Sequence, residues 1–410
     1  MGTVLPHREG RVFLSDLGEF IKGRDITRAD LVQSGIPCLR YGDLYTTYGD
    51  VTDELTSFVS EDTARRATPL HHGDIIFAAS GETAGEIGKA VAWLGNGTAV
   101  AGGDTIILRG HGQDPTFLAH ALNADDAVRQ KSRLGKGHSV VHIHEAELAK
   151  VSVFLPPISD QRKIGEILRT WDDAAKKLGV LRTEKERLLR RFYSVVFQPG
   201  SPINRFWAEY RIGEFLIPRV EYALPKANLP LYSLTIEDGV TPKTERYNRD
   251  FLVKDHNSKT YKIVHPGDIV FNPSNLRWGA IARSDVNHDV LLSPIYEVLE
   301  VSSDKINADY LTHALTCPFQ IRRFATKVEG TLLERMAVKL NAFLMSKIVV
   351  STDKQEQAGF SNLLNSMQEE IQFLLEQFST VVLQKRGLLQ KLLSGNGRLD
   401  SIDTRLPVIR

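Results

Sequence analysis

One short run of the sequence combines side chains that can contact the edges and faces of nucleic-acid bases. It follows a predicted strand that ends at Phe271, and it contains Asn272, Ser274, Asn275, Arg277 and Trp278. Amides and a guanidinium can hydrogen-bond to base edges, and an indole ring can stack on a base. Taken singly, each of these side chains fits a phosphate contact or a solvated position better than base reading. The run as a whole predicts a nucleic-acid contact.

The first half of the chain offers a similar set of candidates. After its own predicted strand, which ends at Phe77, come Ser80, Glu82, Thr83 and Lys89. A basic stretch follows further on, at Arg129, Lys131, Arg133, Lys136 and His138. The cations that hold the corresponding place in the second half are Arg322, Arg323 and Lys327. This matched placement predicts two DNA-contacting faces, in which phosphate contacts supply affinity without sequence information.

The residues that could do covalent chemistry do not form a catalytic motif. Asn272-Pro273-Ser274 lacks the second proline and the aromatic residue with which adenine methyltransferases hold a flipped base. The glycine-rich stretch 80–90 does not match a phosphate-binding loop, because Thr83 stands where the first glycine is needed and Ala90 where a magnesium-binding hydroxyl is needed. His138, His142 and His144 have no further ligand at metal-site spacing, so alternation on a strand explains them better. We therefore expect no catalytic residue and no metal in this chain.

The elements that must position the candidates occur twice. Short apolar runs predict strands, and two short helical patterns accompany them. The strands are expected at 75–78, 91–94, 105–108, 151–154, 262–264, 269–271, 280–282 and 296–299, and the helices at 116–123 and 309–315. The two halves also align by residue, since Gly267 minus Gly73 is 194 and His313 minus His120 is 193. The sequence thus predicts a tandem duplication with a mixed α+β fold.

Each half ends in a long helix with an apolar seam. The first seam contains Ile164, Leu168, Trp171, Leu178 and Phe192, and the second contains Phe360, Leu364, Met367, Ile371, Phe378 and Leu392. The register is shared, because Met367 minus Trp171 is 196. Alternating spacings of three and four are typical of helices that pair. We expect an antiparallel coiled-coil pair about 50 Å long at about 1.5 Å per residue, with pseudo-twofold symmetry and one globular domain at each end.

Composition limits the classes of protein that the chain can represent. It has 410 residues, 42% hydrophobic and 25% charged, which is typical of a multidomain globular protein. A net charge of +1 means that any nucleic-acid surface must be local. Cys38 and Cys317 stand far apart and imply neither a disulfide framework nor a thiolate metal site. With no apolar run of membrane-spanning length, we expect a cytoplasmic protein.

The order of these motifs resembles the specificity subunit of type I restriction–modification enzymes. The resemblance rests on a Gly-Asp-Ile strand, then Leu155-Pro156-Pro157 with Asp160-Gln161, then Trp171-Asp172 within a long helix, all followed by a second copy. That second copy departs from the pattern, with Ser351-Thr352 in place of the two prolines and Met367-Gln368 in place of Trp171-Asp172.

The resemblance implies a division of the chain and a set of partners. Target-recognition domains would occupy 1–155 and 199–350, conserved helices 156–198 and 351–395, and a tail 396–410. The chain would read a bipartite target in double-stranded DNA, perform no chemistry, and scaffold two methyltransferase subunits that use S-adenosylmethionine. Restriction subunits would add translocation and cleavage that need ATP and Mg. Two alternatives remain: a coiled-coil interaction protein without DNA, or the DNA-binding half of a fused restriction or methylation enzyme.

Overall fold

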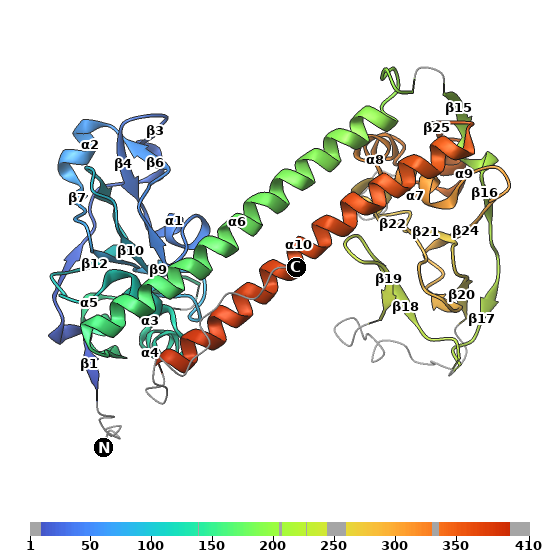
Figure 1. Cartoon of the computed structure of the whole chain (residues 1–410). Coiled ribbons are helices and arrows are strands. Elements are labelled where there is room, and N and C mark those ends of the chain that lie inside the picture. The colour runs from blue at the N-terminus through green and yellow to red at the C-terminus, as the bar shows by residue number, and fades with distance from the viewer. Residues whose placement is uncertain are drawn as a thin grey trace. The chain divides into compact units, whose positions relative to one another are not determined.

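The computed structural model describes residues 10–137, 139–204, 207–226, 228–243, 260–329 and 336–393. The expected tail, 396–410, lies outside these residues. The chain divides into two compact units. Unit 1 comprises residues 1–180 and 375–410, and unit 2 comprises residues 181–374. Each unit holds one mixed α/β domain and part of both long helices (Figure 1).

Unit 1 is built on two five-stranded sheets with strand orders β2-β12-β8-β10-β5 and β3-β6-β4-β11-β7. Its strands are β1 Arg11–Phe13, β2 Glu19–Lys22, β3 Leu31–Val32, β4 Ile36–Leu39, β5 Val51–Thr52, β6 Ser57–Val59, β7 Thr68–Pro69, β8 Ile75–Ala78, β9 Ser80–Gly81, β10 Ala90–Trp93, β11 Val100–Ala101, β12 Thr105–Arg109, β13 Val141–His142 and β14 Ser152–Phe154. Its short helices are α1 Tyr41–Thr46, α2 Glu61–Arg66, α3 Pro115–Asn123, α4 Asp125–Leu134 and α5 Glu145–Leu148.

Strand β8 shows why the apolar runs become central strands. All four of its residues are buried, and it pairs antiparallel with both β10 and β12. Ile75 and Phe77 belong to one apolar cluster, and Ile76 and Ala78 belong to another. Side chains alternate between the faces of a strand, so a run with no polar residue requires a covered sheet on both sides.

Unit 2 repeats the central sheet of unit 1. Its order β16-β24-β21-β22 corresponds to β2-β12-β8-β10. The strands of unit 2 are β15 Ala208–Arg211, β16 Leu216–Pro218, β17 Tyr222–Ala223, β18 Tyr232–Thr235, β19 Gly239–Pro242, β20 Tyr261–Val264, β21 Ile269–Phe271, β22 Ile281–Arg283, β23 Val290–Leu292, β24 Glu297–Val301 and β25 Lys347–Val350. Its short helices are α7 Ala308–Thr316, α8 Pro318–Ala325 and α9 Leu340–Leu344. The predicted strands and short helices are therefore confirmed to within one or two residues.

The Gly-Asp pair before each central strand has a structural role. Asp74 accepts a hydrogen bond from the backbone N–H of His71 at 2.8 Å, and Asp268 accepts one from His265 at 3.0 Å. Each buried carboxylate is also bound by an arginine guanidinium: Arg109 Nε lies 2.9 Å from Asp74, and Arg219 Nε lies 3.0 Å from Asp268. The repeated motif is thus a turn closed by a paired carboxylate, which satisfies a charge that burial would otherwise penalise.

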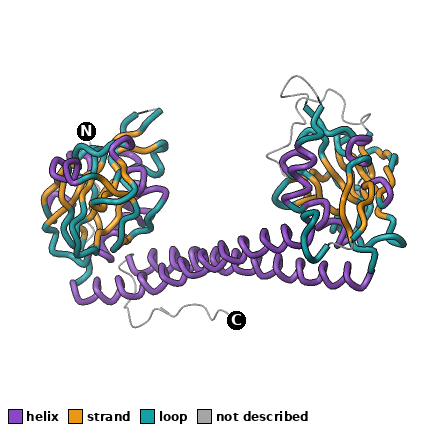
Figure 2. The backbone as a smooth tube through the Cα atoms, turned by 90° about the horizontal axis from the view of Figure 1, so that it is seen from above, coloured by secondary structure: helices purple, strands orange, loops and turns teal. Residues whose placement is uncertain are grey.

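The long helices are α6, Ile158–Phe197, and α10, Lys354–Leu393. The two helices lie side by side (Figure 2), and their contacts show that they are antiparallel in each unit. In unit 1, Lys385 bonds to Asp172 and the ring of Phe378 lies against Gly179. In unit 2, Lys185 Nζ is 2.7 Å from Glu370, and the rings of Phe192 and Phe360 have centroids 6.3 Å apart.

The predicted seams are the inner faces of these helices. Ile164, Leu168, Trp171 and Leu178 are buried on α6, while Leu364 and Leu392 are buried on α10. Phe192, Phe360, Met367, Ile371 and Phe378 are half-buried. Among the helices of the described residues, none is long and apolar enough to cross a bilayer.

A glutamine at the start of each long helix joins that helix to its domain. Gln161 Oε1 accepts from the backbone N–H of Asp114, and its amide donates to Pro156 O at 2.8 Å. Gln357 repeats both bonds, with the N–H of Asn307 and with Ser351 O, also at 2.8 Å. Asp114 and Asn307 are the N-caps of α3 and α7, so each glutamine fixes a short helix against a long one.

Candidate nucleic-acid interface

In unit 1, the loop between β8 and β10 presents an exposed turn. Its first residues form β9, which pairs with β13. Ser80 is buried there, and its hydroxyl lies 2.9 Å from His142 Nδ1. Glu82 and Thr83, which follow, are exposed. The structure therefore brings Glu82 and Thr83 to the surface and places Ser80 inside the domain, where it supports the turn and cannot reach DNA.

Two lysines of the predicted set also point inward. Lys89 donates from its ammonium to Tyr48 O at 2.7 Å, and burial lowers its pKa. Lys131 is only 1% exposed and donates to Gly88 O at 2.5 Å. The reason is their position: Lys89 directly precedes a central strand, and Lys131 lies on the core-facing side of α4. Neither ammonium is available to a phosphate in this conformation.

The remaining cations of unit 1 lie on the outer side of α4 and just beyond it. Arg129 and Arg133 are exposed, and Arg129 lies 3.7 Å from Asp126. Lys136 is exposed and pairs with Glu147 at 2.7 Å. His138 lies outside the described residues. Arg129 and Arg133 are thus the exposed guanidinium groups of α4.

In unit 2, the corresponding loop is a single 3-10 turn, η6, Leu276–Trp278. Leu276 is buried, whereas Trp278 is 57% exposed and carries the guanidinium of Arg277 over its ring at 4.0 Å. Asn272 accepts from the backbone N–H of Ser274 at 3.0 Å, which shapes the turn. The neighbouring side chain of Asn275 is half-buried. This loop therefore presents Trp278 to solvent, with the half-buried guanidinium of Arg277 stacked on its ring.

Helix α8 packs against this loop and supplies the cations. Arg322 is exposed, Arg323 lies over the ring of Phe319 at 5.7 Å, and Lys327 is exposed just past the helix. Arg322 minus Arg129 is 193, the offset of the preceding short helices. Both units thus place an exposed arginine at the same position of the helix beside the exposed loop, an arrangement that can bind a phosphate backbone.

Sequence reasoning missed a buried polar junction in each unit. In unit 1, His120 Nδ1 is 2.7 Å from Asp50, and its Nε2 is 3.1 Å from Asp172. Lys385 Nζ is 3.1 Å from Asp50 and also bonds to Asp172. Burial alone would lower the pKa of His120, but the two carboxylates raise it above its ordinary value.

The three acidic and imidazole groups of this junction have the spacing of a metal site. The ammonium of Lys385, however, already lies between the two carboxylates, where a cation would bind. We therefore interpret the group as an ion-paired junction between the domain, α6 and α10. The signal that could have found it was the histidine that recurs in the two short helices, together with Lys385 as a polar residue in an apolar seam.

The junction of unit 2 is neutral. His313 Nδ1 is 2.9 Å from Tyr193 Oη, and its Nε2 is 2.8 Å from Asn365 Oδ1. Gln368 donates to the same tyrosine hydroxyl at 3.3 Å. Burial lowers the pKa of His313, which keeps the imidazole uncharged. The same helix–helix contact is thus made by charges in one unit and by neutral hydrogen bonds in the other.

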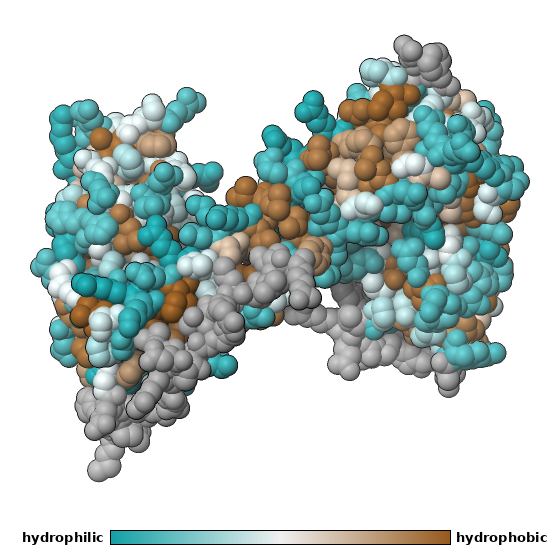
Figure 3. All heavy atoms as spheres, viewed as in Figure 1, coloured by the Kyte–Doolittle hydropathy of each residue, from teal (hydrophilic) through white to brown (hydrophobic). Residues whose placement is uncertain are grey.

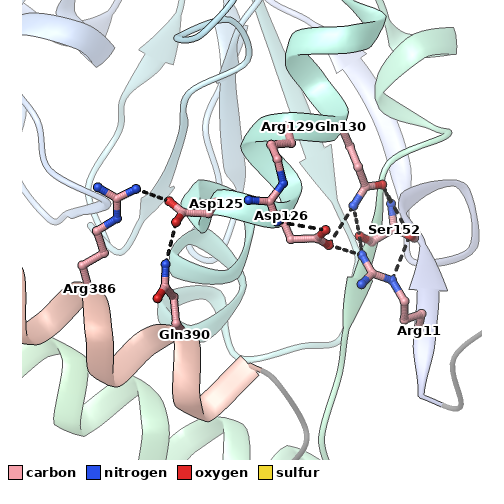
Figure 4. Close-up of polar contacts among 8 residues, drawn as sticks. All are labelled: Arg11, Asp125, Asp126, Arg129, Gln130, Ser152, Arg386 and Gln390. Atoms are coloured by element: carbon pink, nitrogen blue, oxygen red, sulfur yellow. Dashed lines mark hydrogen bonds and ion pairs between the residues drawn. The ribbon is translucent and has the colours of Figure 1, made fainter.

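Helix α4 makes a second set of links within unit 1 (Figure 4). Asp125 accepts from Arg386 at 2.7 Å and from Gln390 at 2.5 Å, both on α10. Next to it, Asp126 pairs with Arg11 and Arg129. The first turn of α4 is therefore tied to α10, which holds the helix that carries the exposed arginines.

Comparison with known proteins agrees with this arrangement. Residues 10–182 match the model of a family described as the type I restriction modification DNA specificity domain. The matched residues cover the globular part of unit 1 and the first part of α6, which is one copy of the repeat and its helix. No curated protein matches the chain by sequence.

Solved structures share the fold over almost the whole chain. The S subunit of a type I restriction-modification system from M. genitalium is 13% identical, with 93% of this chain and 95% of that chain covered and a TM-score of 0.60. A chain from a study of complex assembly and conformational transition of the type I R-M system is 15% identical, with coverage of 95% and 99% and a TM-score of 0.54. Residues 10–182 are therefore similar to a type I restriction modification DNA specificity domain, and the whole chain shares its fold with the S subunit from M. genitalium.

Proposed function

We propose that this chain is the DNA-recognition subunit of a type I restriction–modification complex and that each unit reads one half of a bipartite target. The main support for this proposal is an arrangement that occurs in both units. Both units place an exposed loop, which follows the Gly-Asp strand, beside a helix with an exposed arginine at the same repeat position. In unit 1 these are the turn 82–86 with Arg129, and in unit 2 they are η6 with Arg322.

The two loops are suited to different base sequences. The turn of unit 1 offers Glu82 and Thr83, whose oxygens can accept from a base amino group. The loop of unit 2 offers a guanidinium and an indole ring, which favour guanine edges and stacking or wedge contacts. Different loops on a common frame would produce a target with two unlike halves.

We further propose that the chain is not an enzyme and holds no cofactor. Ser80 and His142 form a hydroxyl–imidazole pair beside the unit 1 loop, but Ser80 is buried, so its hydroxyl is not accessible to a substrate. Methylation of adenine would belong to two partner subunits that bind S-adenosylmethionine, and ATP- and Mg-dependent cleavage to restriction subunits. The named solved structures belong to such systems, one as an S subunit and the other in a study of complex assembly.

The long helices are the proposed contact for the methyltransferase partners. Large apolar side chains are exposed on them: Val382 and Leu383 on the unit 1 part of α10, and Leu363 and Phe373 on the unit 2 part. Figure 3 shows hydrophobic residues at the surface of the helical region. Large apolar side chains that are exposed on a helix are typical of a protein interface.

The deciding experiment is a map of methylated adenines in the source genome with and without this chain. We expect methylation at one split motif of two short half-sites, and we expect it to disappear when the chain is removed. An unchanged map, in cells where the partner methyltransferase is expressed, would refute the proposal. Double substitution R277A/W278A should relax one half-site and leave the other intact.

A further inference from the structure

Lys131 is the most deeply buried lysine or arginine in the described part of the chain, and the proposed function does not use it directly. It is 1% exposed and lies on the inner face of α4. Its stem lies among apolar side chains, because a Cβ at Gly88 would meet Lys131, Ile143 and Leu148 together, and the last two belong to a buried apolar cluster. Among the described residues, no carboxylate lies within ion-pair distance of its ammonium. Burial lowers the pKa of Lys131 to about 7.

Within the described residues, the Lys131 ammonium is hydrogen-bonded to the end of the exposed turn. The ammonium donates to Gly88 O at 2.5 Å. Gly88 has a φ of +71°, and its N–H donates to Ala78 O at 3.1 Å. A Cβ at Gly88 would lie 3.0 Å from Lys131 Cδ, so the lysine stem packs directly on this peptide. Lys131 therefore holds the point at which the turn 82–86 rejoins the central sheet.

Unit 2 shows that the fold does not need a lysine at this position. Phe324 minus Lys131 is 193, the offset of the two short helices. Phe324 is fully buried and packs on Phe343 with ring centroids 5.2 Å apart. It shares its apolar cluster with Leu276 of the corresponding loop, so unit 2 holds that loop by apolar contact.

A buried ammonium with one carbonyl partner costs stability relative to an apolar side chain of similar volume. A buried ammonium that lowers stability can be retained in a protein when it contributes to recognition. We propose that Lys131 is a positioning residue for DNA recognition by unit 1: by binding the Gly88 carbonyl, it fixes the exposed turn 82–86 against the helix that carries Arg129 and Arg133. This inference rests on the proposed function, because it assigns a role within the same DNA face.

The anchor explains how a loop with little internal structure keeps one conformation. Within the turn, the backbone N–H of Glu86 donates to Thr83 O at 3.3 Å. The start of the loop is fixed by the pairing of β9 with β13, and Lys131 fixes its end. A loop held at both ends loses less conformational entropy on binding DNA, which favours affinity and discrimination.

The test uses the full chain with K131M, which keeps an apolar stem and removes the donor. Amide hydrogen exchange of peptides that cover 82–88 is expected to become at least about ten-fold faster, while exchange in 274–280 stays unchanged. The thermal midpoint is expected to stay the same or to rise. A purely structural role for Lys131 predicts the opposite, a lowered midpoint. K131R, which restores a cationic donor, is expected to return exchange in 82–88 toward the wild-type rate.

Methylation mapping gives the functional readout. K131M should relax the half-site that R277A/W278A leaves intact, and F324M, the matched change in unit 2, should not relax it. Unchanged exchange in 82–88, or equal relaxation of both half-sites, would overturn the inference. If the wild-type chain directs methylation at no split motif, the proposed function itself fails, and the role of Lys131 fails with it. A split motif that K131M leaves unaltered would overturn the role of Lys131 alone.

Discussion

The two units solve one packing problem with different chemistry. Each must join a short helix of its domain to both long helices through a buried histidine. Unit 1 surrounds His120 with two carboxylates and the ammonium of Lys385. Unit 2 surrounds His313 with a tyrosine hydroxyl and an amide. The position of the polar junction therefore follows from the repeated fold. The residue types at single positions of the repeat determine whether the junction is charged.

The difference in charge between the two junctions comes from two positions of the repeat. Gln368 stands where unit 1 has Asp172, since 368 minus 172 is 196, and Leu189 stands where α10 has Lys385, since 385 minus 189 is also 196. A carboxylate and its ammonium are thus absent together at the equivalent places of unit 2. Removing both members of a buried ion pair is far less costly than removing one, because no unpaired charge remains.

The largest effects should come from charges placed in the shared seam, where the two units are alike. Leu168→Asp in unit 1 and Leu364→Asp in unit 2 each place a carboxylate at a fully buried position. We expect each to destabilise its own unit by about 4 kcal/mol, through lost apolar burial and a buried unpaired charge. Hydrogen exchange resolved by unit measures the effect. An Asp at exposed Val180 is the matched control, and a loss there of equal size would contradict the seam assignment.

The next effect should separate the two junctions. Lys385→Met leaves Asp50 and Asp172 facing each other with only His120 as a cation, so we expect unit 1 to lose about 2 kcal/mol. Asn365→Leu removes one neutral acceptor from His313, and we expect unit 2 to lose about 1 kcal/mol. Urea unfolding followed by exchange in each unit measures both values. Equal losses in the two units would show that charge adds nothing to the junction of unit 1.

Acidification should act on the two junctions in opposite directions. The pKa of His120 is raised in the folded state, so its contribution to stability is present below about pH 6.5, the ordinary value, and is lost as pH rises through the folded pKa. The pKa of His313 is lowered, so its contribution is present above about pH 6.5 and is lost as pH falls through the folded pKa.

The corresponding measurement is unit-resolved stability between pH 5 and pH 8, as the difference between wild type and H120Q or H313Q. The groups that face His120 are Asp50, Asp172 and Lys385, and those that face His313 are Tyr193, Asn365 and the more distant Asp309. We expect the H120Q difference to grow on acidification and the H313Q difference to shrink. If both stability differences changed in the same direction on acidification, His120 and His313 would have the same protonation state in the folded protein, against our expectation.

The smallest expected effect concerns the feature that the units share at the proposed DNA face. Arg129→Ala and Arg322→Ala should each weaken binding to any DNA sequence and lower the slope of log affinity against log salt by about 1. Fluorescence anisotropy with a duplex that contains the mapped motif measures this slope. The matched control is Arg187→Ala, an exposed arginine of α6 that pairs with Glu184. Loss of recognition at one half-site with an unchanged salt slope would make either arginine a base reader.

Local sequence patterns are enough to predict the helices and strands that build the two units. The apolar runs at 75–78 and 269–271, the recurring histidine of the short helices, and the seams from Ile164 and Phe360 predicted the strands, short helices and long helices that the structure contains. Such features follow from local periodicity. Because the sequence is duplicated, each pattern occurs twice, and each prediction is supported by both copies.

Which polar side chains face outward depends on the tertiary packing of each unit. Ser80, Lys89 and Lys131 are residue types that can contact DNA, but their side chains point into the domain. The side chains of Arg129, Arg322 and Trp278 point to solvent. A lysine in a basic stretch looks alike in sequence whether its ammonium meets water or the carbonyl of a residue 43 positions away. The contacts of Asp50, His120, Asp172 and Lys385 are equally non-local, because they form only when helices distant in sequence pack together. Side-chain direction within a fold depends on these long-range contacts, which local spacing does not encode.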